Sequence, residues 1–329
     1  MKLAIIILNW NGQKLLEQFL PSVIKYSEGA DIYVADNAST DGSIDFIKSK
    51  YPKIKIIHNK ENGGYAKGYN DALKFVEADV FCLLNSDIEV TKNWLNPIIN
   101  AFNKYPNTKI IQPKILDFKK KNHFEYAGAA GGFIDKYGYP YCRGRLFETL
   151  EKDDGQYNDI TEIFWATGAC LFIKSDVFKT LKGFDEYFFA HMEEIDLCWR
   201  AKNLGYSIKF VGNSEVYHVG GATLKKTNPK KTYLNFRNSL FTLTKNANGF
   251  LLGKILIRLI LDGIVAIKFL LEFKPKNALA ILKAHFSFYN SIERLLKQRK
   301  SIKTKNKYYS KTSIVFDYFI KRKTKYKNL

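Results

Sequence analysis

Residues 3–12 read Leu-Ala-Ile-Ile-Ile-Leu-Asn-Trp-Asn-Gly, an apolar run that ends abruptly in polar residues and a glycine. We expect a buried strand here rather than a signal peptide, because no small-residue cleavage site follows the run. Similar runs occur at 31–35, 54–58, 80–84 and 109–112, and helix-favouring segments lie between them at 13–26, 43–50, 65–77 and 92–104. This alternation predicts an α/β fold with a mostly parallel sheet flanked by helices.

Polar residues follow every one of the first four predicted strands. The chain continues into Asn9 and Asn11 after the first, Asp36 after the second, a loop containing Asn62 after the third, and Asn85 with Asp87 after the fourth. Turns favour these residue types, so one such end alone indicates little. Ligands of α/β sheets bind beyond the carboxyl ends of the strands. Four polar ends at one edge therefore predict a composite binding site.

Two of these ends have more specific alternatives. Gly63-Gly64-Tyr65-Ala66-Lys67 opens a helix, where glycines and free N–H groups suit a phosphate. The segment lacks the known phosphate-loop signatures, so a plain tight turn is the favoured alternative. Asp87 can hold a divalent cation whose other ligands are phosphate oxygens, or it can cap the next helix.

Three carboxylates crowd into residues 193–196, as Glu193, Glu194 and Asp196. Apolar neighbours raise the pKa of such carboxyls, so that one of them can accept a proton near neutral pH. On a helix Asp196 can pair with Arg200, and a surface helix with an ion pair is the alternative. His218 is either a hydrogen-bonded structural residue or a metal ligand, the latter only if the fold brings it near Asp87.

In this order the motifs resemble the glycosyltransferases of family 2 with the GT-A fold, a Rossmann-like architecture. They are most similar to rhamnosyltransferase-like members that build bacterial surface polysaccharides. The resemblance covers about residues 1–240. It rests on segments 7–12, 34–43, 62–70, 84–87, 166–170, 183–186 and 193–200.

The resemblance implies roles for individual residues. Those that bind the nucleotide sugar would be Asn9, Asn11, Asp36, Asn62, Gly64, Lys67, Asn85 and Asp87. Asp87 and His218 would hold Mg²⁺ or Mn²⁺, and Asn85 replaces the first aspartate of the usual metal motif. Glu194 would be the base of an inverting transfer, with Glu193 as the alternative. We place Trp165, Asp196 and Trp199 in the acceptor site; core packing is the alternative for the tryptophans.

The charge of the chain is uneven. Its 52 Lys and Arg against 32 Asp and Glu give a net charge of +20, and residues 294–329 contain thirteen basic residues and one acid. Such a tail suits a polyanion, and an anionic membrane surface fits better than nucleic acid, because no nucleic-acid-binding motif is present. The four cysteines lie far apart, which predicts free buried thiols in a reducing compartment.

We therefore expect a catalytic region at residues 1–228 and a helical, basic region at 229–329. Lys254, Arg258, Asp262 and Lys268 fall on one stripe of an otherwise apolar segment. This pattern favours an amphipathic helix in a membrane interface over a spanning helix, with packing on the catalytic region or on a second copy as alternatives.

The expected protein is a metal-dependent transferase that is cytoplasmic and peripheral on the inner face of the membrane. It would take a nucleotide-sugar donor and a glycan or lipid-linked acceptor, and no nucleic acid. The alternatives are a catalytically inactive sugar-nucleotide-binding relative and a basic nucleic-acid-binding protein.

Overall fold

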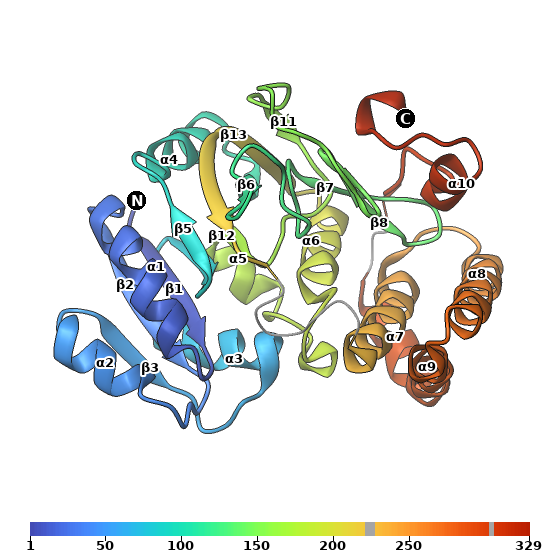
Figure 1. Ribbon diagram of the computed structural model, residues 1–329, viewed down its shortest axis with the longest axis horizontal. Coiled ribbons are helices and arrows are strands. Elements are labelled where there is room, and N and C mark those ends of the chain that lie inside the picture. Colours follow the sequence, from blue (N-terminus) through green and yellow to red (C-terminus); the bar gives the residue numbers. More distant parts are fainter. Residues whose placement is uncertain (221–227, 303–305) are drawn as a thin grey trace.

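The computed structural model describes residues 1–220, 228–302 and 306–329, and its centre is a nine-stranded sheet (Figure 1). The strand order is β11-β13-β6-β12-β4-β1-β2-β3, with β5 paired to β13. Strands β1 to β4 are parallel, whereas β12 runs antiparallel to both β4 and β6. The expected α/β fold is confirmed. The strands are β1 (Leu3–Asn9), β2 (Ala30–Asp36), β3 (Lys55–His58), β4 (Val80–Asn85), β5 (Ile88–Val90), β6 (Thr108–Asp117), β11 (Ile160–Glu162), β12 (Cys170–Lys174) and β13 (Ser207–His218).

The sheet separates two hydrophobic cores, because successive side chains of a strand point to opposite faces. Ala4 and Ile6 of β1 belong to one core, and Leu3, Ile5 and Ile7 belong to the other. Helices α3 (Gly64–Ala72), α5 (Ser175–Thr180) and α6 (Glu193–Asn203) cover the first core. Helices α1 (Gln13–Tyr26), α2 (Ser43–Lys50) and α4 (Leu95–Lys104) cover the second. Short 3₁₀ turns lie at η1 (Leu73–Phe75) and η2 (Glu186–Phe188).

Residues 116–163, whose sequence shows no regular pattern, contain a second sheet. Its strands are β7 (Gly132–Ile134), β8 (Pro140–Cys142), β9 (Arg145–Leu146) and β10 (Thr149–Leu150). Two or three residues are too few for an alternating pattern to be visible in the sequence. A side chain at position 132 would meet the ring of Trp165 at 2.0 Å, which explains this glycine.

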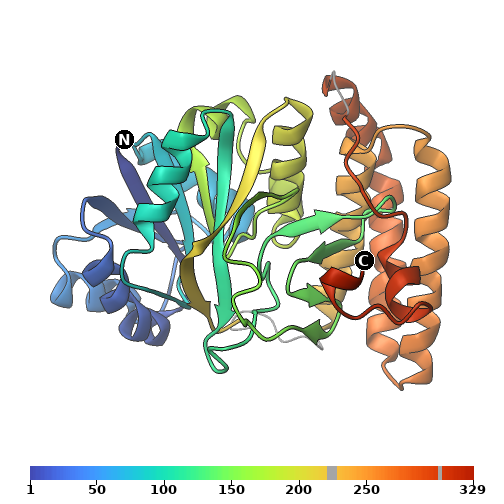
Figure 2. The ribbon, with the colours of Figure 1, turned by 90° about the horizontal axis from the view of Figure 1, so that it is seen from above.

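The last hundred residues are helical, as expected, and lie at the end of the molecule opposite the N-terminus (Figure 2). They form α7 (Pro229–Asn246), α8 (Leu251–Leu271), α9 (Pro275–Ser301), α10 (Ile314–Phe319) and the 3₁₀ turn η3 (Tyr326–Asn328). Leu240 of α7 and Phe288 of α9 share the core of α3 and α6. No helix within the described ranges is long and apolar enough to cross a membrane. The four cysteines are buried and free, as predicted.

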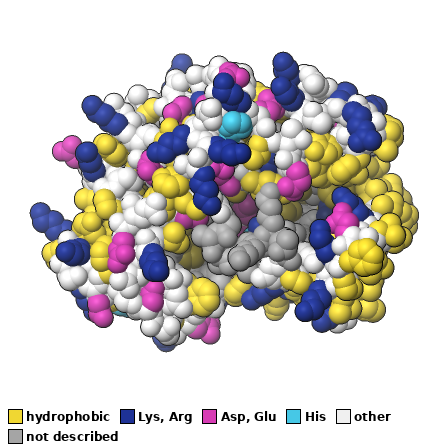
Figure 3. Space-filling view, viewed as in Figure 1, with side chains coloured by type: hydrophobic (Ala, Val, Ile, Leu, Met, Phe, Trp, Pro, Cys, Tyr) yellow, Lys and Arg dark blue, Asp and Glu magenta, His cyan; other side chains and the backbone are white. Residues whose placement is uncertain are grey.

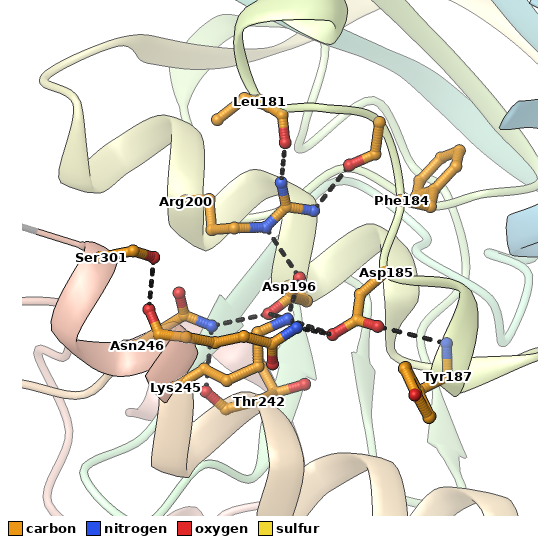
Figure 4. Close-up of polar contacts among 12 residues, drawn as sticks. Leu181, Phe184, Asp185, Tyr187, Asp196, Arg200, Thr242, Lys245, Asn246 and Ser301 are labelled. Atoms are coloured by element: carbon orange, nitrogen blue, oxygen red, sulfur yellow. Dashed lines mark hydrogen bonds and ion pairs between the residues drawn. The ribbon is translucent and has the colours of Figure 1, made fainter. Parts of the chain in front are cut away.

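A buried ionic cluster joins α6 to α7 (Figure 4). The carboxylate of Asp196 accepts from Arg200 Nε at 2.8 Å, from Lys245 Nζ at 2.9 Å and from Asn246 Nδ2 at 2.8 Å. Lys245 also pairs with Asp185 at 2.7 Å. Burial alone would raise the pKa of Asp196, but the charges of Lys245 and Arg200 outweigh it and hold the pKa at about 2. The predicted Asp196–Arg200 pair is confirmed, and the cluster ties the C-terminal helices to the sheet domain.

Replacing Asp196 with asparagine is expected to lower the free energy of unfolding by about 3 kcal/mol, because Arg200 loses its counter-ion and Lys245 keeps only its pair with Asp185. Urea unfolding followed by circular dichroism measures the loss. The matched control is Asp154→Asn, which removes an exposed pair with Lys152 and should cost less than about 1 kcal/mol. Equal stability of the two variants would contradict the structural role given to the cluster.

Candidate active site

The carboxyl ends of β1 and β2 bring the first predicted binding residues together. Asn9 lies opposite Asp36 in the strand register, and its Nδ2 donates to Asp36 Oδ1 at 3.3 Å and to Ser39 Oγ at 3.1 Å. Asn11, with a positive φ of 50°, accepts from the N–H of Thr40 at 2.7 Å. Asn9 and Asp36 are buried, while Asn11 is exposed. The two loops thus form one hydrogen-bonded edge.

The glycine loop adjoins this edge, but its helix N-terminus is already occupied. Asn62 Oδ1 accepts from the N–H of Gly64 at 3.0 Å. The N–H groups of Tyr65 and Ala66 donate to the carbonyl of Phe189 at 2.8 and 3.3 Å. Gly64 has a φ of +74°, and a Cβ there would lie 2.4 Å from the same carbonyl. The tight turn is therefore explained without a phosphate. The ammonium of Lys67 pairs with Glu61 at 3.6 Å and also with Asp71.

Asp87 and His218 do meet, as the metal-ligand alternative requires. Asp87 follows β4, and its Oδ1 lies 3.1 Å from Nε2 of His218 at the end of β13. The other ring nitrogen, Nδ1, lies 3.1 Å from Oε2 of Glu125. Burial would lower the pKa of His218, but the two carboxylates raise it to about 10. All three side chains are buried. Asn85 is half-buried at the end of β4.

The crowded carboxylates lie at the N-terminus of α6. Glu193 is 4% exposed, whereas Glu194 is only partly buried, and one oxygen of each lacks a hydrogen-bond partner among the residues described. Burial raises the pKa of Glu194 to about 7 and that of Glu193 well above its usual range. Burial raises the pKa of Tyr65 well above its usual range, and Tyr69, Glu193 and Glu194 add to this rise. Tyr65 Oη donates to the carbonyl of Gly168 at 2.8 Å, and Ala169 accepts from the N–H of Asn85 at 3.0 Å.

A strained segment leads into α6. Phe189, His191 and Met192 have φ values of 63°, 70° and 72°, which non-glycine residues adopt at a cost. Asn238 of α7 holds this segment in place, because its Nδ2 donates to the carbonyls of Phe188, Ala190 and His191 at 3.0, 2.9 and 2.7 Å. The backbone before the carboxylates is thus fixed from the C-terminal helices.

With this geometry established, comparison with known proteins identifies the family. Residues 4–181 match the family described as glycosyl transferase family 2.

The chain belongs to glycosyl transferase family 2.

It is therefore a glycosyltransferase. Among relatives of this family 2 transferase is the N-acetylglucosaminyl-diphospho-decaprenol L-rhamnosyltransferase of Mycobacterium tuberculosis. The two are 24% identical over 235 residues, which cover 66% of this chain and 75% of the relative.

Solved structures show that the fold is GT-A. The structure of GalNAc-T7 with UDP, GalNAc and Mn²⁺ aligns with a TM-score of 0.60 and 16% sequence identity. The alignment covers 75% of this chain and 48% of the GalNAc-T7 chain, so this chain spans about half of that protein. S. aureus TarS 1–349 in complex with UDP-GlcNAc aligns with a TM-score of 0.56 and 17% identity, over 91% of this chain and 84% of its own.

The three residues assigned to the acceptor of this family 2 transferase are all buried, which corrects that prediction. Trp199 is 0% exposed and contacts the rings of Phe164 and Tyr308. Trp165 is 4% exposed and donates its Nε1–H to the carbonyl of Phe133 at 2.8 Å. Asp196 is 0% exposed within the ionic cluster. The burial of both rings favours core packing, the stated alternative.

Sequence reasoning missed Glu125 and Asn238. Glu125 lies in a stretch without a recognisable pattern, and Asn238 is one polar residue within a helix. Each residue contacts a part of the site that is distant in the sequence, so no local sequence pattern points to its role.

Proposed function

We propose that this chain transfers a sugar, with inversion, from a dTDP- or UDP-linked donor to a glycan or lipid-linked acceptor in cell-surface polysaccharide synthesis. The observation that carries the proposal is Glu194, a partly exposed carboxyl with an unpartnered oxygen and a pKa of about 7. Glu194 acts electrostatically on Tyr65, whose hydroxyl donates to the carbonyl of Gly168, and the next residue, Ala169, accepts from the N–H of Asn85 at the end of β4.

In the proposed reaction Glu194 takes the proton of an acceptor hydroxyl as that oxygen bonds to the anomeric carbon. The bond from this carbon to the phosphate oxygen breaks on the opposite face, and the nucleoside diphosphate leaves. One displacement inverts the anomeric centre, with Glu194 as general base. Glu193 is the less suitable base, because it is almost fully buried.

Asp87 and His218 are the proposed metal ligands. The carboxylate of Asp87 is a ligand that suits Mg²⁺ and Mn²⁺, and the imidazole of His218, 3.1 Å away, would bind the metal in its neutral form, although no group of three such ligands occurs in the described ranges. The donor's diphosphate would complete the coordination. A bound cation supplies positive charge that stabilises the leaving diphosphate.

For the donor edge we propose Asn9, Asn11 and Asp36 at the base and ribose, and Asn62, Gly64 and Lys67 beside the nucleotide. We further propose that residues 1–228 are the catalytic unit and that residues 229–329 bring it to an anionic membrane surface, on the cytoplasmic side.

A thermal-shift screen of nucleotide sugars tests the donor. At a hundredfold excess over its dissociation constant, the correct donor is expected to stabilise the protein by about 2.7 kcal/mol, and more with Mn²⁺ than without it. The free sugar is the control, since it lacks the diphosphate. If neither UDP- nor dTDP-sugars raise the melting temperature, with or without metal, the proposed donor class is wrong.

A further inference from the structure

Helix α8 packs on the protein through its charged side. Lys254, Arg258 and Asp262 are its buried residues. Arg258 Nε donates to Asp262 Oδ1 at 2.8 Å, and its guanidinium lies 3.8 Å from the centre of the Tyr139 ring. Tyr139 Oη donates to Asp262 Oδ1 at 3.1 Å. The charged stripe of α8 is therefore its contact surface with the second sheet.

The apolar side of α8 consequently faces outward. Leu256, Ile260, Ile264, Ile267 and Leu271 follow each other at intervals of three or four residues and are 52–77% exposed. They form one continuous stripe along a helix about 30 Å long. Helix α9 adds a second stripe of exposed residues, among them Leu282 and Phe286. Hydrophobic side chains gather over these helices at the right-hand edge of Figure 3. We call the α8 stripe, together with Leu282 and Phe286, the outer apolar face.

Basic side chains border this face. Lys268 and Lys274 are exposed, and the acid between them, Glu272, is paired with both, at 3.7 and 2.7 Å. Lys230, Lys276 and Lys283 line an open groove of about 540 Å³ whose surface also includes Leu279 and Tyr233. The ammonium of Lys230 lies 4.8 Å from the ring centre of Phe189, so the groove adjoins the strained segment before the catalytic carboxylates.

We infer that the outer apolar face lies in the headgroup–acyl boundary of an anionic bilayer, and that the lysine groove takes the anionic headgroups beside the active site. This inference rests on the proposed membrane association and names the surface that performs it. Large apolar area bordered by lysines is the combination that an anionic interface binds. In a two-fold dimer through the same face the lysine borders would oppose each other, which disfavours a second copy.

The basic tail, which the sequence suggested as the membrane contact, is instead fixed to the small sheet in its described part. Ile314 is 0% exposed, Tyr308 Oη donates to the carbonyl of Lys136 at 2.6 Å, and Tyr318 Oη lies 2.8 Å from Thr149 Oγ1. Lys303 and Lys305 lie outside the described residues. Deleting the tail would therefore remove packed structure, so it cannot serve as a clean test of membrane binding.

Co-sedimentation of the full chain with vesicles tests the inference. We use phosphatidylcholine vesicles with and without phosphatidylglycerol, and the double variant Ile260→Glu/Ile264→Glu. The wild type is expected to bind the anionic vesicles, and the double variant to bind them at least about tenfold more weakly, because two charged groups would enter the apolar layer. The matched control is Phe75→Glu, an equally exposed apolar residue on η1, which should bind like the wild type.

Three results would overturn the inference. In the first, the α8 double variant binds the vesicles as well as the wild type does. In the second, the tail variant Lys321→Gln/Arg322→Gln/Lys323→Gln loses binding while the α8 variant keeps it. In the third, light scattering shows that the wild type is a dimer and the α8 variant a monomer. A wild type that binds neither vesicle would overturn the membrane association as well. Stabilisation by the nucleotide sugar, measured on the same samples, tests the transferase proposal separately.

Discussion

Replacing Glu194 with glutamine is expected to lower the rate of sugar transfer by about 10²–10⁴-fold, the usual contribution of a general base. Glutamine keeps the size of the side chain but cannot accept the acceptor's proton. The affinity for the donor should stay the same, because Glu194 is proposed to act on the acceptor. Transfer is measured by release of the nucleoside diphosphate under saturating donor, and donor affinity by thermal shift.

The matched control is Glu193→Gln, the same change one residue earlier. Glu193 is almost fully buried, so an acceptor hydroxyl reaches it less easily than it reaches Glu194, and burial raises its pKa well above its usual range. Its replacement should therefore cost much less activity. A larger loss in Glu193→Gln than in Glu194→Gln would transfer the role of base to Glu193.

The pH profile provides a second test of the same assignment. A base must be deprotonated to act, and burial raises the pKa of Glu194 to about 7. Transfer at saturating substrates should thus be slow below pH 6 and rise through about pH 7, above the range of an ordinary glutamate. In Glu194→Gln this rise should disappear. A profile that is flat between pH 5 and 8 in the wild type would contradict the role of Glu194.

The second large effect is expected at Asp87. Asp87→Asn should lower transfer about 10²–10³-fold, the range seen when one stabilising contact to transition-state charge is removed. It should also abolish the additional stabilisation that Mn²⁺ gives to the donor complex in the thermal-shift assay. The variant keeps the shape of the side chain but loses the negative charge that lies 3.1 Å from His218.

The control for Asp87 is Glu89→Gln, two residues along the chain. Glu89 pairs with Lys121 at 2.6 Å on the surface, so its neutralisation should leave both transfer and the Mn²⁺ effect intact. If Asp87→Asn keeps the Mn²⁺ effect, Asp87 is not a ligand.

Those elements of the fold could be predicted whose structure depends on residues close together in the sequence. Helices Gln13–Tyr26 and Ser43–Lys50 have the predicted bounds, because each carries an apolar stripe between polar turns. That Asp87 and His218 lie side by side could be stated only as a condition for metal binding, because the two residues follow different strands. The ion pair of Asp196 with Arg200 followed from helix geometry alone.

Other features depend on contacts that no local pattern encodes. The sequence indicated that α8 is amphipathic, but amphipathicity does not say which of the two faces meets the protein. Arg258 and Asp262 turn inward because Tyr139 and the carbonyl of Gly138 offer them partners. Likewise, the rings of Trp165 and Trp199 suit either a sugar or a core, and only their burial decides between these.

The strained segment before α6 is hydrogen-bonded to both α3 and α7. The carbonyl of Phe189 caps α3 beside the donor loop, while neighbouring carbonyls are held by Asn238 of α7. The proposed donor loop and the proposed base are therefore joined through one short backbone segment, so that a shift of one is expected to move the other. If the proposed site is correct, helix α7, which lies outside the family 2 match, helps to set the alignment of nucleophile with leaving group. Natural or designed changes in acceptor preference have to preserve that alignment while they alter the surface around it.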